Sequence, residues 1–152
     1  MIRELSGNET GLAYEAMLEL RPRIGTREQF VERVNNVQRP ESYRLVAVFE
    51  NGQEQAASVG GFRVLHFLAW GNAMYLDDLS TKASFRGRGH GGQILDWCMA
   101  EARRLELGQF HLDSGVGIDR MAAHRLYLNR KMRISSHHFQ IDLDQRTGPV
   151  AT

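Results

Sequence analysis

The stretch that decides the fold is Phe85-Arg86-Gly87-Arg88-Gly89-His90-Gly91-Gly92-Gln93, in which four glycines and two arginines stand within nine residues. A strand pattern over 75–81 comes directly before it, and a helix pattern over 94–102 follows directly. Glycine lets the backbone approach a ligand closely because it has no Cβ. The first N–H groups of a helix have no partner within it, and the helix dipole adds partial positive charge there. The sequence therefore predicts a pyrophosphate cradle at this turn.

Two classes of phosphate-binding protein use a loop of this kind. Gly87-x-Gly89-x-x-Gly92 fits the dinucleotide fingerprint, and Asp113 lies at about the right distance downstream for a ribose contact. A dinucleotide fold, however, needs parallel strands that alternate with helices. The region upstream, residues 43–81, instead shows three consecutive strand patterns with short turns, which is typical of an antiparallel meander. The context argues against an NAD(P)-binding enzyme.

The second class fits the residues better. Arg86-x-x-Gly89-x-Gly91 resembles the pyrophosphate signature of the GNAT superfamily of acyl-CoA-dependent N-acyltransferases. Leu79-Ser80-Thr81 resembles the strand end that pairs with pantetheine in that family, and Ala123-His124-Arg125-Leu126-Tyr127 resembles its second motif, A-x-x-L-Y. The resemblance covers nearly the whole chain, although its specific motifs lie in the second half. It implies acetyl-CoA as co-substrate, direct attack by an amine acceptor in a ternary complex, and no metal.

The resemblance also implies which residues hold the cofactor. The N–H groups of residues 88–92 would bind the two phosphates, and Arg86 or Arg88 would neutralise them. The backbone of the splayed strand would pair with pantetheine. The expected cofactor-binding residues are Leu79, Thr81, Arg86, Gly87, Arg88, Gly89, His90, Gly91 and Gly92.

Two residues are candidates for catalysis. Tyr127, which stands at the tyrosine of the second motif, would donate a proton to the thiolate of the leaving CoA. Asp77 would accept the proton of the amine or anchor a cationic acceptor. Strict strand alternation predicts that Asp77 shares a face with Tyr75, Leu79 and Thr81 while Asp78 faces the other way, which favours Asp77. The acceptor is expected to enter under the loop 21–25.

Other reactive side chains carry weaker signals. His111 and Asp113 are expected on one face of the neighbouring strand, close to the splayed gap, and a histidine has the right pKa to accept a proton. Adjacent strand residues point to opposite faces, so His137 and His138 cannot chelate one metal ion together. Cys98 lies among apolar helix residues and is expected to be buried and inert.

The chain departs from the family's pattern in two places. The second motif often begins with Asn seven residues before the tyrosine, where this chain has Arg120. The helix that carries the motif often ends in Gly-Phe, where this chain has Lys131-Met132. The first departure puts in doubt a side-chain contact with pantetheine at that position. Neither departure affects the cradle or Tyr127.

The expected fold is α/β of the α+β type. Its central sheet is mixed and mainly antiparallel, with six or seven strands, about four flanking helices and a splayed pair of parallel strands. Strands are predicted over 2–6, 43–49, 56–68, 73–81, 110–113 and 133–143, with a bulge at Gly60-Gly61. Helices are predicted from Asn8 or Thr10 to Leu20, from a Thr26 cap to before Pro40, from the glycine loop to Leu107, and over 121–130. Residues 1–152 are expected to form a single domain, with a frayed tail over 144–152.

The amino-acid composition limits the classes of partner that the protein is expected to bind. The 152 residues carry a formal net charge of +1, so no general affinity for nucleic acid or membranes follows. A single cysteine and no apolar signal region favour the cytoplasm. The acceptor is expected to be a small-molecule or peptide amine, and a homodimer is left open.

A non-catalytic acyl-CoA-binding module or sensor is the rival function, because it would need the cradle but neither Asp77 nor Tyr127.

Overall fold

The computed structural model describes residues 1–143. Contacts divide the chain into two compact units, residues 1–112 and residues 113–152, and each is described by itself. The tail over 144–152, expected to be frayed, lies outside the described residues.

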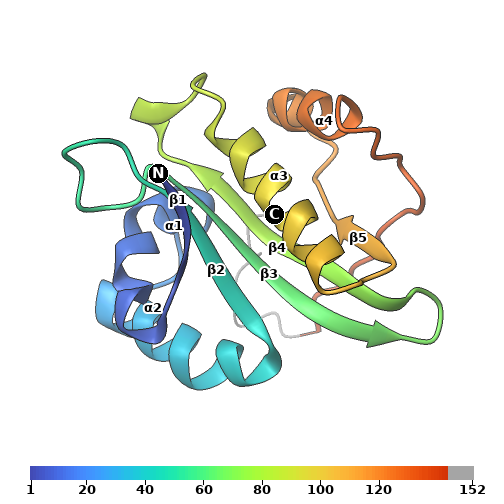
Figure 1. The fold of residues 1–152 in the computed structure, drawn as a ribbon, viewed down its shortest axis with the longest axis horizontal. Coiled ribbons are helices and arrows are strands. Elements are labelled where there is room, and N and C mark those ends of the chain that lie inside the picture. The colour runs from blue at the N-terminus through green and yellow to red at the C-terminus, as the bar shows by residue number, and fades with distance from the viewer. Residues whose placement is uncertain (144–152) are drawn as a thin grey trace. The chain divides into compact units, whose positions relative to one another are not determined.

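A five-stranded sheet forms the centre of the first unit, with the strands in chain order from β1 to β5 (Figure 1). Neighbouring strands are antiparallel except for β4 and β5, which are parallel. The strands are β1 (Ile2–Leu5), β2 (Tyr43–Val48), β3 (Ser58–Phe67), β4 (Gly71–Thr81) and β5 (Gln109–Leu112). The predicted meander of β2, β3 and β4 is confirmed. A run of antiparallel neighbours in chain order is incompatible with the dinucleotide-binding fold.

Helices cover both faces of this sheet. Helices α1 (Tyr14–Leu20) and α2 (Arg27–Arg33) pack on one face, and α3 (His90–Arg104) packs on the other. Thr26 caps α2 in a capping box with Gln29, as the sequence predicted. Shorter turns complete the unit: 3₁₀ segments at Gly7–Ala13, Arg39–Glu41 and Ala83–Phe85, and a π-helical segment at Val34–Gln38.

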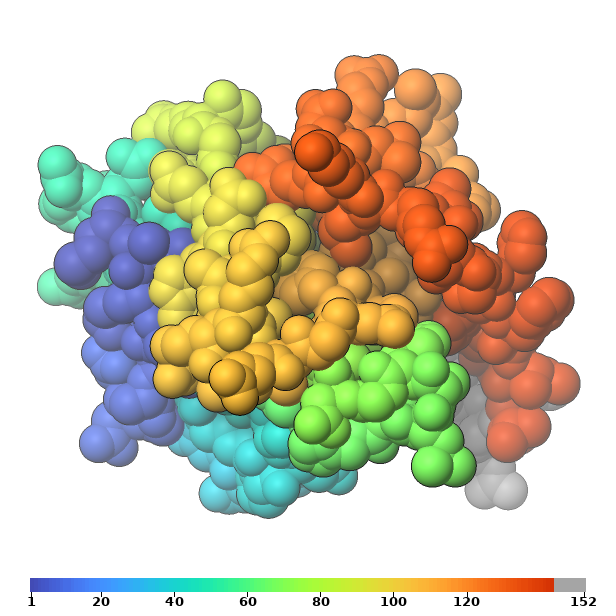
Figure 2. Space-filling view, turned by 45° about the vertical axis from the view of Figure 1, so that its right-hand side comes forward, coloured from blue at the N-terminus to red at the C-terminus, as the bar shows by residue number. Residues whose placement is uncertain are grey.

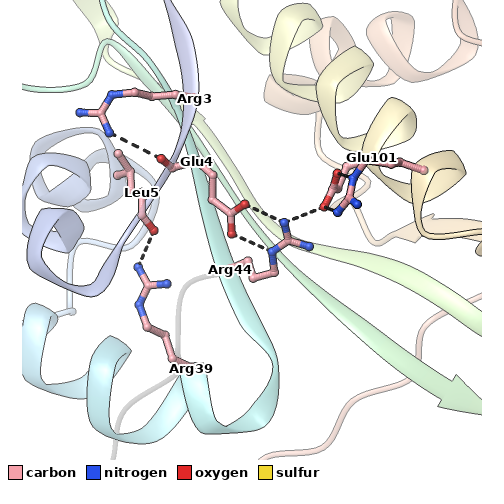
Figure 3. Close-up of polar contacts among 7 residues, drawn as sticks. Arg3, Glu4, Leu5, Arg39, Arg44 and Glu101 are labelled. Carbon is pink, nitrogen blue, oxygen red and sulfur yellow. Dashed lines mark hydrogen bonds and ion pairs between the residues drawn. The ribbon is translucent and has the colours of Figure 1, made fainter.

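An ion-pair network ties α3 to the sheet (Figure 3). Arg44 of β2 donates to both carboxylate oxygens of Glu4 of β1, at 2.7 and 2.6 Å, and to Glu101 of α3 at 2.7 Å. Arg104 adds two hydrogen bonds to the same Glu101 carboxylate. These donors lower the pKa of Glu101 from 4.5 to about 2, and hydrogen bonds from both carboxylates raise the pKa of Arg44. The network holds α3, whose first turn follows the glycine loop, against the sheet.

The second unit contains a 3₁₀ segment, Ile118–Arg120, which leads directly into α4 (Met121–Leu128). The strand predicted over 133–143 is wrong, because these residues adopt no regular structure. The apolar side chains of Ile134, Phe139 and Ile141 are more than three-quarters exposed. Alternation places apolar residues on one face, but a strand also needs a partner for its backbone hydrogen bonds. The described residues therefore hold five strands rather than six or seven.

Within residues 1–143, no helix has the length and apolar character needed to cross a membrane.

Candidate acyl-donor and acceptor sites

The glycine loop connects β4 to α3 through two left-handed residues. Gly87 has φ +77° and Gly89 has φ +82°, a region that side-chain-bearing residues rarely adopt. Gly89 is the N-cap of α3, and it offers no side chain to occupy the free N–H groups of the first turn. No described atom lies within 4 Å of where a Cβ would be at either glycine. The loop thus presents open backbone at the positive end of a 15-residue helix.

Cationic side chains flank this loop at the surface. Arg86 pairs with Glu19 at 3.0 Å and donates to the Thr81 carbonyl at 3.2 Å. Arg88 pairs at 3.3 Å with Glu50, which belongs to the loop between β2 and β3. Figure 2 shows residues 80–100, in yellow-green to yellow, on the same face of the molecule as residues of that loop, in blue-green. Both arginine side chains are more than half exposed, so these ion pairs are weak and an anionic ligand can replace the carboxylates.

His90 occupies the first position of α3 and is buried. Its Nε2 lies 2.7 Å from Glu50, and this hydrogen bond is the main reason that the pKa of Glu50 is lowered. Its Nδ1 is buried without a hydrogen-bond partner among the described residues. His90 therefore packs beneath the loop and fixes its conformation.

The edge of β4 that leads into the glycine loop is open. Pairing with β5 ends at Leu76 and Leu112, although β4 continues to Thr81. The Lys82 N–H bonds to Ala57 next to β3, and backbone groups alternate in direction along an antiparallel strand. Leu79 and Thr81 therefore turn their N–H and C=O groups away from β3. The expected splayed pair is confirmed, with these two residues at its open edge.

A β-bulge interrupts β4 at the two candidate carboxylates. Asp78 lies opposite Gly61 and Leu76 lies opposite Phe62, so Asp77 is an extra residue without its own partner on β3. The bulge was expected at Gly60-Gly61; it lies one residue further on, opposite the step from Gly61 to Phe62, and the extra residue is in β4. The predicted alternation is therefore wrong at this point, because a bulge shifts the side-chain register by one residue.

The bulge places both carboxylates on the α1/α2 face of the sheet. Gly61, the partner of Asp78, faces Tyr43 of the α1/α2 core, and Asp77 contacts Arg63, whose guanidinium lies over the Tyr43 ring. Leu79 lies on the opposite face, because its partner Gly60 faces Ile94 of α3.

The face of Thr81 follows from its partner in the same way. Thr81 lies opposite Ser58 on β3, two residues from the Leu79–Gly60 pair, so it shares the α3 face with Leu79. The expectation that Asp77 shares a face with Leu79 and Thr81 is thus corrected.

The two carboxylates differ in how fully they are engaged. Asp78 accepts from Arg21 at 2.8 Å through one oxygen and from the Tyr43 hydroxyl at 2.7 Å through the other. Among the described residues, Asp77 accepts side-chain hydrogen bonds only from Arg63, at 2.6 Å through Oδ2, and its pKa is raised above 3.8 because burial outweighs the effect of Arg63. Asp77 is the carboxylate with an oxygen available to a further partner.

Sequence reasoning did not identify the partners of these carboxylates. Arg21 belongs to the loop predicted to cover the acceptor, and its second bond, to the Asp77 carbonyl at 3.2 Å, brings that loop to the bulge. Arg63 and Tyr43 were missed because their pairing depends on the register of three strands. One signal was present: a Cβ at Gly61 would clash with the Tyr43 hydroxyl, so the glycine is what lets Tyr43 reach Asp78.

His111 lies in the paired part of β5, opposite Tyr75. Its ring stacks on Trp70 at 3.8 Å, and its Nε2 lies 2.7 Å from Gln109. These contacts join the ring to Trp70 and Gln109, while the His111 backbone stands one residue before Leu112, where the β4–β5 pairing ends. Asp113, its expected neighbour, begins the second unit and contacts His138 at 3.3 Å.

Tyr127 lies in the last turn of α4 and is buried. Burial raises its pKa above 10, and the positive charge of Arg120 opposes that rise. A phenol with a raised pKa remains protonated at neutral pH, as a proton donor must.

Two further kinds of reactive side chain are potential metal ligands and the single thiol. The described residues contain no group of three His, Cys, Asp or Glu side chains that could hold a metal ion. Cys98 is buried, as predicted, and burial raises the pKa of its thiol to about 12, so it is a poor nucleophile.

Comparisons with known proteins agree with these features. The acetyltransferase (GNAT) family matches residues 12–132. The uncharacterized N-acetyltransferase YhdJ of Bacillus subtilis (strain 168) is 33% identical over 125 residues, which cover 82% of this chain and 84% of YhdJ.

Solved structures show the same fold at low identity. An acetyltransferase of Trypanosoma brucei has a TM-score of 0.79 at 14% identity, covering 94% of this chain and 99% of that one. An aminoglycoside N-acetyltransferase, AAC(6')-Iy, solved in complex with CoA, has a TM-score of 0.77 at 10% identity, covering 93% of each chain. The loop, the splayed strands and the match over most of the chain lead to one conclusion: this protein belongs to the GNAT acetyltransferase family.

Proposed function

We propose that this acetyltransferase moves the acetyl group of acetyl-CoA to the nitrogen of a small-molecule or peptide amine by direct attack in a ternary complex. The observation that carries the proposal is the glycine loop, with two left-handed glycines at the N-terminus of α3 and arginines on both sides. The N–H groups of residues 88–92 would bind the pyrophosphate, and Arg86 and Arg88 would exchange Glu19 and Glu50 for phosphate oxygens.

The open edge of β4 would hold the pantetheine arm. Leu79 and Thr81 direct backbone donors and acceptors away from β3 at the point where β5 has separated. An amide-containing chain can pair with such an edge as an added strand does. The thioester would then lie along β4 and lead from the glycine loop toward the bulge.

The acid–base chemistry divides between two residues in this proposal. The free oxygen of Asp77 accepts a proton from the ammonium form of the acceptor, directly or through water, and the neutral amine attacks the thioester carbonyl. When the C–S bond breaks, Tyr127 gives its phenolic proton to the CoA thiolate. The second proton of the attacking nitrogen then returns to the phenolate, directly or through water, and Asp77 releases the first proton to solvent. The products are the N-acetylated amine and CoA. Residues 1–152 would thus work as one domain, and the cytoplasm is the compartment we propose.

A non-catalytic acyl-CoA-binding module is the second candidate. It would need the glycine loop and the open edge of β4, and it would leave Asp77 and Tyr127 without chemistry. The partly free Asp77 carboxylate and the buried, protonated Tyr127 favour the enzyme.

A panel of amines separates the two functions. The purified protein is incubated with acetyl-CoA and with diamines, amino sugars, amino acids and peptides, and both free thiol and acetylated product are measured. The enzyme releases CoA and forms product in equal amounts with at least one acceptor class. Acetyl-CoA binding without thiol release across the whole panel would support the module.

A further inference from the structure

Negative and positive side chains alternate around the bulge in β4. Asp77 accepts from Nε of Arg63 at 2.6 Å through Oδ2, and Nη1 of Arg63 donates to Glu41 at 3.2 Å. Arg21 donates to the Asp77 carbonyl oxygen at 3.2 Å and to Asp78 at 2.8 Å. The proposed function uses only the remaining oxygen of Asp77, so it leaves both arginines without a part in acceptor binding.

Arg63 has donors that its partners in the structure do not use. Asp77 accepts from Nε and Glu41 accepts from Nη1, and no described residue accepts a hydrogen bond from Nη2. The guanidinium is held in place because it also lies over the Tyr43 ring, with Cζ 5.4 Å from the ring centroid. A guanidinium binds a carboxylate most strongly through two parallel N–H groups. The Nη1 and Nη2 end of Arg63 can therefore take a carboxylate in this way.

Glu41 is a weak occupant of that end of Arg63. Its side chain is 64% exposed, and its hydrogen bond of 3.2 Å is longer than the 2.6 Å bond between Arg63 and Asp77. An exposed ion pair contributes little free energy, because water solvates both charges well. A ligand carboxylate that reaches both Nη atoms can thus displace Glu41.

The two arginines also limit the charge that an acceptor can carry. Both guanidinium groups lie within hydrogen-bond distance of Asp77, Arg63 at its side chain and Arg21 at its carbonyl oxygen. An acceptor with several ammonium groups, such as a polyamine or an amino sugar, would bring further positive charges close to these arginines and be repelled. An acceptor with one ammonium group and one carboxylate would match both signs of charge.

We propose that the acceptor carries a carboxylate on the carbon atom that bears its amine, as a free α-amino acid does. Its ammonium group binds Oδ1 of Asp77, and its carboxylate binds Nη1 and Nη2 of Arg63 in place of Glu41. The two protein groups are in direct contact, and a single carbon atom joins the two charged groups of such an acceptor. This inference rests on the proposed function and names the substrate class of the same site.

The test compares acceptors that differ only in the carboxylate. Each of a set of L-amino acids is assayed beside its amide, and CoA release gives kcat/KM for both. We expect the best amino acid to exceed its amide by about 10- to 100-fold, the range for one hydrogen-bonded charge pair. The amine of an amino-acid amide is the less basic of the two and is more often neutral, so ionisation of the amine alone would favour the amide.

Arg63→Met is expected to bring this ratio to about one, through a higher KM for the amino acid. Both acceptors are assayed on the same variant, so a loss of stability or a change at Asp77 affects both and cancels in the ratio. Glu41→Gln removes the competing carboxylate, so it should lower KM for the amino acid about two- to fivefold and leave the amide unchanged. A purely structural ion pair would not give a lower KM when it is broken.

Arg103→Met, which removes a positive charge from the exposed side of α3, is the control and should keep the wild-type ratio. A wild-type ratio near or below one, a ratio that Arg63→Met leaves unchanged, or faster turnover of polyamines or amino sugars would overturn the inference and leave the acetyltransferase in place. Absence of CoA release with every acceptor would instead overturn the proposed function, and this inference with it.

Discussion

Asp77 and Asp78 are adjacent in β4, yet both carboxylates face the α1/α2 side of the sheet, because Asp77 is the extra residue of a β-bulge. The bulge gives each carboxylate its own arginine, Arg63 for Asp77 and Arg21 for Asp78. The face of the sheet on which each carboxylate lies therefore cannot distinguish their roles. They differ instead in how many of their oxygens accept a hydrogen bond.

Asp77→Asn is expected to lower kcat, or to raise KM for the amine if Asp77 holds a cationic acceptor. Asp78→Asn is expected to leave turnover nearly unchanged and to lower the free energy of unfolding by about 1–3 kcal/mol, because it weakens a charge-assisted pair with Arg21. Steady-state kinetics and urea unfolding of both variants check this. An inactive Asp78→Asn beside an active Asp77→Asn would reverse the assignment.

The pH dependence of the wild type gives a second check on Asp77. Burial raises the pKa of Asp77 above 3.8, so its base form is lost on acidification at a higher pH than for an ordinary aspartate. The rate should fall with decreasing pH through that raised pKa. The Asn variant should lack this acid limb and regain part of its rate in more alkaline buffer, where more of the amine is neutral. An identical acid limb in both proteins would exclude Asp77 as its source.

Tyr127→Phe keeps the ring and removes only the hydroxyl. The single-turnover rate of CoA release should fall by about two orders of magnitude, the usual size of general acid catalysis. Because burial raises the pKa of Tyr127 above 10, the wild-type rate should show no loss of this acid at neutral pH. The Kd for acetyl-CoA should barely change. An unaltered rate with the best acceptor would leave Tyr127 a packing residue.

Glu101→Gln tests the network that holds α3 on the sheet. The folded-state pKa of Glu101, about 2, lies below its ordinary 4.5, so its ion pairs stabilise the folded state above pH 4.5. That contribution is lost as the pH falls from 4.5 toward 2. The variant should be less stable by roughly 1–3 kcal/mol at pH 7, and the difference from the wild type should shrink on acidification.

Urea unfolding at pH 7 and at pH 3 measures this difference, with the exposed Glu54→Gln as the control. A constant difference between Glu101→Gln and the wild type at both pH values would show that ionisation of Glu101 is not the cause.

The sequence predicted those parts of the fold that local chemistry specifies. Thr26 caps a helix with Gln29, and the glycine loop requires left-handed residues, so both could be identified without contacts. The meander and the splayed parallel pair followed from turn residues and from the resemblance. A bulge was predicted at Gly60-Gly61, but the strand that carries its extra residue could not be, because an extra residue in one strand is defined only by its pairing with another.

The other incorrect or missing predictions also concern contacts between residues that are distant in the sequence. Residues 133–143 were interpreted as a strand, but the described residues offer this segment no partner strand. The ion pairs of Arg63 and Arg21, and the hydrogen bonds of His124 to Ser114 and Gly115, join residues whose proximity depends on strand register and loop geometry. A single sequence does not directly specify strand register or loop geometry.

Acetyl-CoA binding by two glycine variants tests the central claim most directly. Gly89 has φ +82° at the loop and Gly71 has φ +63° at the β3–β4 hairpin, and no described atom lies within 4 Å of where a Cβ would be at either glycine. Alanine at either site therefore costs about 1–2 kcal/mol of backbone strain without a clash. At a hundredfold excess over Kd, acetyl-CoA should stabilise the wild type and Gly71→Ala by about 2.7 kcal/mol. Gly89→Ala should lose that stabilisation, and NAD should stabilise none of the three. Equal stabilisation of both variants by acetyl-CoA, or stabilisation by NAD alone, would contradict the account.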